Sequence, residues 1–194
     1  KWNIDNGPEV VREGLQDISD PDKRELVAGF LRRYEDEVVP GLSSLRRSVI
    51  HNDANDHNVL IGDARQNKTE TWEKSVVGLI DFGDMVESYT IAELAVALAY
   101  VMLGKSDPLA AAASVVEGYH SEFELTELEI RLLYHMACMR ICMSVAISAS
   151  QQRDEPDNQY LSVSESTGWE LLQHLESLPA NMAQYVFRDA CGLP

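Results

Sequence analysis

The sequence has few cysteines and no apolar run long enough to cross a bilayer. Its three cysteines are an odd number, and Cys138 and Cys142 lie four residues apart in an apolar stretch. This pattern argues against a disulfide framework and predicts a reducing, cytoplasmic location. A metal site on this pair is an alternative, but two small buried side chains on one helix face are the favoured interpretation. The longest apolar stretch, Ile91 to Leu103, is interrupted by Glu93 and is too short for a membrane span.

Basic residues are scarce. The chain has 16 Lys and Arg against 32 Asp and Glu, and its formal net charge is −16. Such a charge opposes binding to nucleic acid or to an anionic membrane, so neither is expected as a partner. It suits a cationic substrate such as an amine, although most acidic surfaces serve only solubility.

A glycine-rich phosphate loop is also missing. No such loop precedes a strand, and residues 1–48 are patterned as helix and turn. The first residues, Lys1 to Asn6, are polar and lack both an initiator Met and the apolar segment of a secretory signal. The 194 residues are enough for one sizeable core or for one large lobe of a longer protein.

Hydrophobic periodicity predicts a few short strands and a large helical block. Thr126 followed by Glu129 forms a capping box at the start of one helix. Helices are expected at residues 8–15, 20–38, 90–103, 108–120, 126–153, 162–178 and 180–190. Strands are expected at residues 48–51, 58–62 and 76–80, the last two paired as a hairpin around a polar connection at 63–75. This order predicts a single α+β, mostly α, lobe.

Two polar segments beside predicted strands carry residue types that suit phosphoryl transfer. The first fits the pattern H-x-D-x-x-x-x-N with His51, Asp53 and Asn58, and the second begins with Asp81 in a D-F-G sequence. Transfer to a hydroxyl needs a carboxylate to accept the proton and oxygen ligands to hold Mg²⁺. We therefore predict Asp53 as catalytic base, Asn58 and Asp81 as Mg²⁺ ligands, and His51 as the residue that holds the loop. The alternative is that Asp53 and Asn58 only form a turn.

Both segments resemble motifs of the aminoglycoside phosphotransferase and choline kinase-like superfamily. Residues 49–61 resemble its catalytic-loop motif and residues 80–84 its metal motif, although many members have Gly where this chain has Asn52. The resemblance runs from about residue 20 to the end of the chain. Softer matches to the hydroxylysine kinase-like branch, and to phosphotransferase domains fused ahead of class III aminotransferases, lie at residues 117–119, 140–145, 160–165 and 187–192.

The resemblance implies a protein-kinase-like fold in which residues 1–194 form the C-terminal, catalytic lobe and the N-terminal nucleotide-binding lobe is absent. It implies Mg²⁺-dependent transfer of the terminal phosphoryl group of ATP or GTP to a hydroxyl of a small amino alcohol or hydroxy amino acid. The expected partners are this substrate, the missing lobe in cis and a fused aminotransferase domain. By itself the chain is expected to be inactive.

Two non-enzymatic alternatives remain. One is a pseudokinase-like lobe that binds a ligand or supports a fused aminotransferase, and the other is an acidic helical interaction domain in which the motif is accidental.

Several residues also have two interpretations. Residues 55–57 either touch substrate or shape the loop, and Asp84 is either a solvated turn acid or a ligand for a second metal or a cationic substrate. Glu93 is expected to have a buried polar partner, and Arg140 to pair with a buried acid or a substrate carboxylate. The aromatic residues Tyr119, Tyr160 and Trp169 are expected in the core, with a pocket as the alternative.

Overall fold

The structure is a computed structural model that describes residues 2–63, 74–154, 159–179 and 181–194. Within these ranges it contains seven α-helices and four short strands, which confirms the predicted α+β, mostly α, class. The helices are α1 (Gly7–Gly14), α2 (Pro21–Glu37), α3 (Thr90–Met102), α4 (Pro108–Glu122), α5 (Glu127–Asp154), α6 (Gln159–Glu176) and α7 (Met182–Ala190). The strands are β1 (Arg47–Ile50), β2 (Val59–Asp63), β3 (Lys74–Leu79) and β4 (Val86–Tyr89). Every predicted element is present, and its ends differ from the prediction by three residues or fewer.

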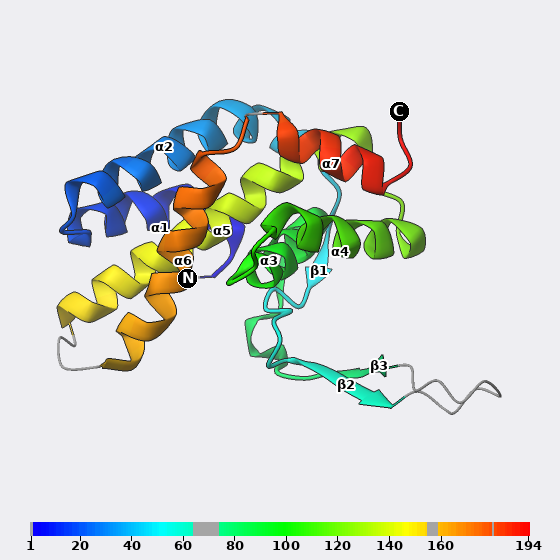
Figure 1. Ribbon diagram of the computed structural model, residues 1–194, viewed down its shortest axis with the longest axis horizontal. Coiled ribbons are helices and arrows are strands. Elements are labelled where there is room, and N and C mark those ends of the chain that lie inside the picture. Colours follow the sequence, from blue (N-terminus) through cyan, green and yellow to red (C-terminus); the bar gives the residue numbers. More distant parts are fainter. Residues whose placement is uncertain (1, 64–73, 155–158, 180) are drawn as a thin grey trace.

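Helix α5 is the centre of the core. Helices α1, α2, α3, α6 and α7 all pack against it (Figure 1). Its length and apolar composition would also suit a membrane span, but 78% of its most apolar window is buried inside this fold. Cys138 and Cys142 lie on α5 as buried free thiols, and burial raises the pKa of Cys138 to about 12. Both cysteines therefore act as small apolar side chains, as predicted.

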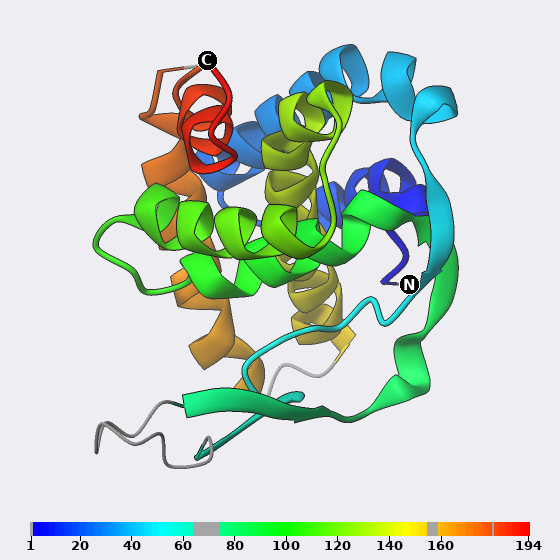
Figure 2. The same ribbon diagram turned by 90° about the vertical axis from the view of Figure 1, so that its right-hand side faces the viewer.

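The strands form two separate antiparallel pairs. Strands β2 and β3 pair as the predicted hairpin, which lies outside the helical block (Figures 1 and 2). Residues 64–73 of the polar connection between them are outside the described residues. Strand β1 pairs with β4, with Arg47 opposite Tyr89 and Ile50 opposite Val86. Strand β4 was not predicted, because a four-residue segment containing Glu87 and Ser88 carries too little hydrophobic pattern to be recognised.

A capping box holds the start of α5 and ties it to the strand that leads into the candidate site. The Thr126 amide donates to Glu129 Oε2 at 2.9 Å, and the Glu129 amide donates back to Thr126 Oγ1 at 3.2 Å. Arg46, just before β1, donates through Nε to Glu129 Oε1 at 2.9 Å and through Nη2 to Oε2. Glu129 is only 1% exposed. One buried carboxylate thus satisfies a helix end and joins it to β1.

We expect Glu129→Gln to lower the free energy of unfolding by about 1–3 kcal/mol at pH 7, because it removes charge-assisted hydrogen bonds from a buried site. Burial by itself raises the pKa of Glu129, but the hydrogen bonds from Arg46 and Thr126 outweigh it, so the net pKa lies below its usual 4.5. A carboxyl whose folded pKa is lowered stabilises the fold above its unfolded pKa and loses that contribution as pH falls through the folded pKa. The gap between wild type and variant should therefore narrow below pH 4.5. Urea unfolding across pH measures it, with the exposed Glu122→Gln as control; a gap that persists at low pH would contradict the assignment.

Candidate active site

His51 connects the two predicted catalytic segments. It follows the last residue of β1 and is buried. The Asp53 amide donates to His51 Nδ1 at 3.3 Å, so the other ring nitrogen, Nε2, carries the proton and donates to the Ile80 carbonyl oxygen at 2.9 Å. The Phe82 ring meets the imidazole edge-on, with ring centroids 5.0 Å apart. His51 therefore holds both the loop that contains Asp53 and the turn that contains Asp81.

A second link brings the two segments together at the same point. The Ile80 amide donates to the Asn58 carbonyl oxygen at 3.0 Å, just beyond the paired strands β2 and β3. Ile80 thus binds His51 through its carbonyl and Asn58 through its amide. Asp81 follows Ile80 directly in the sequence. The hairpin therefore places it beside the loop that contains Asp53 and Asn58.

Asp53 lies at a junction of loop and helices. Its side chain is 21% exposed, and Oδ2 accepts a hydrogen bond from Asn58 Nδ2 at 2.8 Å. Its Oδ1 accepts from the Tyr100 hydroxyl on α3 at 3.2 Å and lies 3.7 Å from Arg140 Nη2 on α5. Burial is the main reason that the pKa of Tyr100 is raised, so the phenol keeps its proton and serves as a donor. The carboxylate is held in place by these groups and still reaches solvent.

Tyr100 was not predicted as a site residue, although the sequence contains a signal for it. It lies seven residues after Glu93, which places both on one face of α3. Glu93 Oε2 accepts the Asn52 amide at 2.9 Å, which supplies the buried polar partner expected for it. Two polar residues spaced by two helical turns in an apolar helix thus mark the face that supports the loop. Arg140 lies beside Asp53, which supplies the acidic partner that was one of its two predicted interactions.

Two residues of the site have left-handed backbone conformations. Asn52 has φ +67° and Asp81 has φ +59°. Among non-glycine residues, Asn and Asp tolerate this region best. The frequent Gly at the position of Asn52 in the superfamily therefore has a conformational explanation.

We expect Asn52→Gly to keep or raise stability, within about 1 kcal/mol, because glycine adopts positive φ without a steric cost. It also removes the Asn52 side-chain oxygen, which is buried and has no hydrogen-bond partner among the described residues. Asn52→Ala removes the same oxygen but keeps a Cβ in the left-handed region, at a cost of about 1–2 kcal/mol. Chemical unfolding of the two variants isolates the backbone effect. An alanine variant as stable as the glycine variant would show that the conformation is not the cause.

The remaining polar residues of the loop fall into two groups. Asn55 Oδ1 accepts the amides of His57 at 2.8 Å and Asn58 at 3.1 Å, so Asn55 shapes the loop. Asp56 and His57 point into solvent, with side chains 85% and 90% exposed. Asp84 is also exposed.

Asn58 and Asp81 offer oxygen atoms that suit Mg²⁺ as ligands. The Asn58 side-chain nitrogen is used by Asp53, which leaves its amide oxygen for a cation. The Asp81 side chain is exposed, and one of its oxygens accepts the Gly83 amide at 3.3 Å. The searched, described residues contain no cluster of three His, Cys, Asp or Glu that could hold a metal. One carboxylate and one amide oxygen instead suit Mg²⁺, which keeps water and phosphate oxygens as its other ligands.

The chain matches a family of phosphotransferases and several curated proteins named as kinases. A family described as "Phosphotransferase enzyme family" matches residues 1–130. The chain is 31% identical over 175 residues to hydroxylysine kinase of Mus musculus, covering 90% of this chain and 46% of that protein. It is 33% identical over 178 residues to hydroxylysine kinase of Danio rerio, covering 91% of this chain and 48% of that protein. The chain thus spans about half the length of the curated relatives it matches. No solved structure matches it significantly.

Proposed function

Because the chain belongs to the phosphotransferase enzyme family, we propose that it carries the catalytic residues of a small-molecule kinase. This enzyme transfers the terminal phosphoryl group of ATP or GTP to a hydroxyl of a hydroxy amino acid or small amino alcohol. The names of the relatives favour hydroxylysine within this class. The observation that carries the proposal is Ile80, whose backbone binds both His51 and Asn58 and so links the turn that begins at Asp81 to the loop that contains Asp53.

In this proposal each residue has a separate task. Asp53 accepts a hydrogen bond from the substrate hydroxyl and takes its proton as the oxygen attacks phosphorus. Asn58 and Tyr100 hold the carboxylate in place, and His51 holds the loop. Asn58 and Asp81 would hold Mg²⁺, which neutralises negative charge on the phosphates when bound. Transfer is direct, so no covalent enzyme intermediate is required.

The surface of the hairpin supports the proposal that another lobe covers this site. Large apolar side chains are exposed on the two strands of the hairpin and just after it, namely Leu60, Ile61, Val76, Val77, Leu79, Ile80 and Phe82. Exposed apolar side chains in this number are typical of an interface. We propose that the nucleotide-binding lobe of a longer protein packs here, and that residues 1–194 are the C-terminal lobe. A fused aminotransferase remains a further proposed partner, and the three free cysteines support a cytoplasmic setting.

The test is a substrate screen on the full-length protein, with 5-hydroxylysine, ethanolamine and choline against Mg²⁺-ATP and Mg²⁺-GTP. We expect phosphorylation of at least one of these alcohols by the full-length protein and none by the 194-residue chain. Nucleotide binding without turnover of any alcohol would favour the pseudokinase-like alternative instead.

A further inference from the structure

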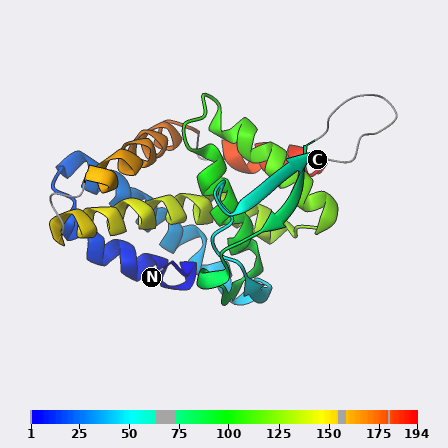
Figure 3. The same cartoon turned by 90° about the horizontal axis from the view of Figure 1, so that it is seen from below.

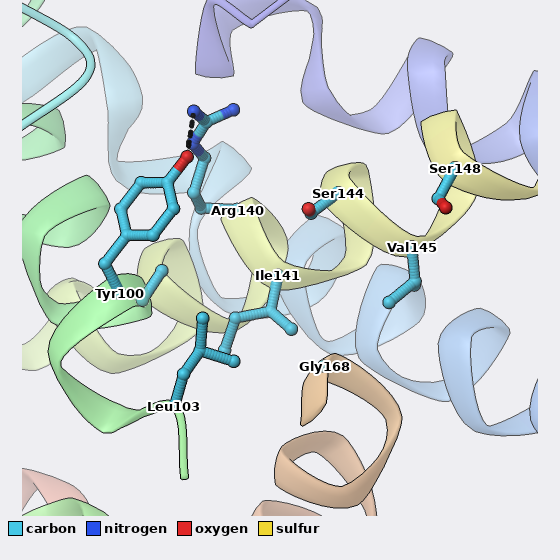
Figure 4. A pocket seen from close by; sticks show the side chains of 9 residues that line it. Tyr100, Leu103, Arg140, Ile141, Ser144, Val145, Ser148 and Gly168 are labelled. Atoms are coloured by element: carbon cyan, nitrogen blue, oxygen red, sulfur yellow. Dashed lines mark hydrogen bonds between the residues drawn. The ribbon is translucent and has the colours of Figure 1, made fainter. Parts of the chain in front are cut away.

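A cavity lies between α3, α5 and α6, and its lining includes Tyr100 and Arg140, which both contact Asp53. Its volume is about 70 Å³, which gives room for a carboxylate-sized group, and it is open to solvent on one side. Leu103, Ile141 and Val145 contribute apolar walls, whereas Tyr100, Arg140 and Ser144 contribute polar groups (Figure 4). Among the described residues that line the cavity, Arg140 is the one with a charge. The cavity therefore contains a positive charge although the chain as a whole is strongly acidic.

Arg140 has hydrogen-bonding capacity that the protein does not use. The residue is 3% exposed, and its Nη2 donates to the Tyr100 hydroxyl at 3.4 Å. Its Nη1 is buried and has no hydrogen-bond partner among the described residues. The Trp2 ring stacks against the guanidinium, 4.4 Å from its centroid, which holds the group but accepts no conventional hydrogen bond. An unpaired buried guanidinium nitrogen is costly unless a ligand completes it.

Asp53 compensates the positive charge of Arg140 only in part. The distance from Arg140 Nη2 to Asp53 Oδ1 is 3.7 Å, which is longer than a hydrogen bond. The same carboxylate already accepts hydrogen bonds from Asn58 and Tyr100. A second anion beside Arg140 would therefore find an available donor.

We propose that this cavity binds the carboxylate of the substrate, with the guanidinium group of Arg140 as its principal donor. The inference rests on the proposed kinase function and specifies its substrate class: a hydroxy amino acid rather than an amino alcohol without a carboxylate. Arg140 lies 3.7 Å from Asp53 and also lines the cavity, so the proposed base and the proposed carboxylate site share this residue. Ser144, one turn along α5, adds a hydroxyl at the open side.

The experiment compares 5-hydroxylysine with 1,5-diaminopentan-2-ol, its counterpart without the carboxylate, in the full-length wild-type protein. We expect kcat/KM to be about 10- to 100-fold higher for hydroxylysine, the value of one charge-assisted hydrogen bond at a buried site. Equal kcat/KM values would overturn the carboxylate site and leave the kinase function intact. Phosphorylation of neither compound would instead count against the proposed function. In that event, calorimetry is used to compare the affinities of the protein for lysine and for cadaverine, which lacks the carboxylate. Equal affinities would overturn the carboxylate site.

Variants on α5 assign the effect to one residue. Arg140→Met should remove the preference, lowering kcat/KM for hydroxylysine by about 10- to 100-fold more than for the diaminopentanol. The ratio of substrates cancels any damage to Asp53 that both reactions share. Arg140→Lys keeps a positive charge and should restore part of the preference. Arg131→Met, an exposed change on the same helix, should leave the preference unchanged. A preference that persists in Arg140→Met would overturn the assignment, and the wild-type comparison remains decisive if that variant does not fold.

Discussion

Replacement of Asp53 by Asn in the full-length protein is expected to lower kcat by about 10²- to 10⁴-fold, the usual contribution of a positioned base. An amide cannot accept the hydroxyl proton. It also fits poorly here, because both Asp53 oxygens accept hydrogen bonds, one from Asn58 and one from Tyr100. An amide nitrogen on the side of Asn58 would face a donor, and one on the side of Tyr100 would displace the hydroxyl proton from its present hydrogen bond. Steady-state kinetics with the best substrate from the screen measure the loss, and KM should change far less than kcat.

The control for Asp53→Asn is the same substitution at Asp36. This residue is exposed on α2 and has no role in the proposed site. Asp36→Asn removes one negative charge in the same way, and kcat should stay within about 3-fold of wild type. Thermal unfolding of both variants separates lost chemistry from lost fold. A folded Asp53→Asn variant with kcat within 10-fold of wild type would exclude Asp53 as the base.

Replacement of Asp81 by Asn is expected to raise the Mg²⁺ concentration for half-maximal rate by about 100-fold. Asp81 supplies the one carboxylate of the proposed pair, and Mg²⁺ binds a neutral amide oxygen much more weakly. The substitution is well suited to the backbone, because Asn tolerates the left-handed conformation at φ +59°. The expected defect therefore reports on the metal rather than on the turn. Titration of Mg²⁺ at saturating nucleotide measures it.

The outcome at Asp81 also discriminates between the proposals. If high Mg²⁺ restores much of the rate of Asp81→Asn, the residue acts through the metal. The Asp36→Asn control should show the wild-type Mg²⁺ dependence. An Asp81→Asn variant with unchanged Mg²⁺ dependence would remove Asp81 from the metal site and leave the role of Asp53 untouched.

Much of the fold follows from local patterns. The spacing of apolar residues predicts α2 and α5, and Thr126 and Glu129 mark the start of α5, because capping is decided within a few residues. The hairpin β2–β3 is likewise a pairing of neighbours in the chain. The proposed catalytic pattern could be read from the sequence for the same reason, since His51, Asp53 and Asn58 occupy one short loop.

The sequence pattern did not predict the contacts between distant segments. Strand β4 has little pattern of its own and exists because β1 pairs with it. Figure 3, seen from below, shows the hairpin strands in front of the helices. The double hydrogen bonding of Ile80 depends on where the hairpin places it. Neither feature has a local signal, because each depends on partners more than 20 residues away.

By itself the sequence determined which residues could carry the chemistry and which helices would form, because both depend on short-range spacing. The tertiary structure decided which groups surround that chemistry. Arg140 and Tyr100 lie 40 residues apart and meet at Asp53 only because α3 packs against α5. The same packing leaves the cavity and the unused nitrogen of Arg140. Burial and unpaired hydrogen-bonding capacity are properties of packed elements, so the proposed carboxylate site became visible only in three dimensions.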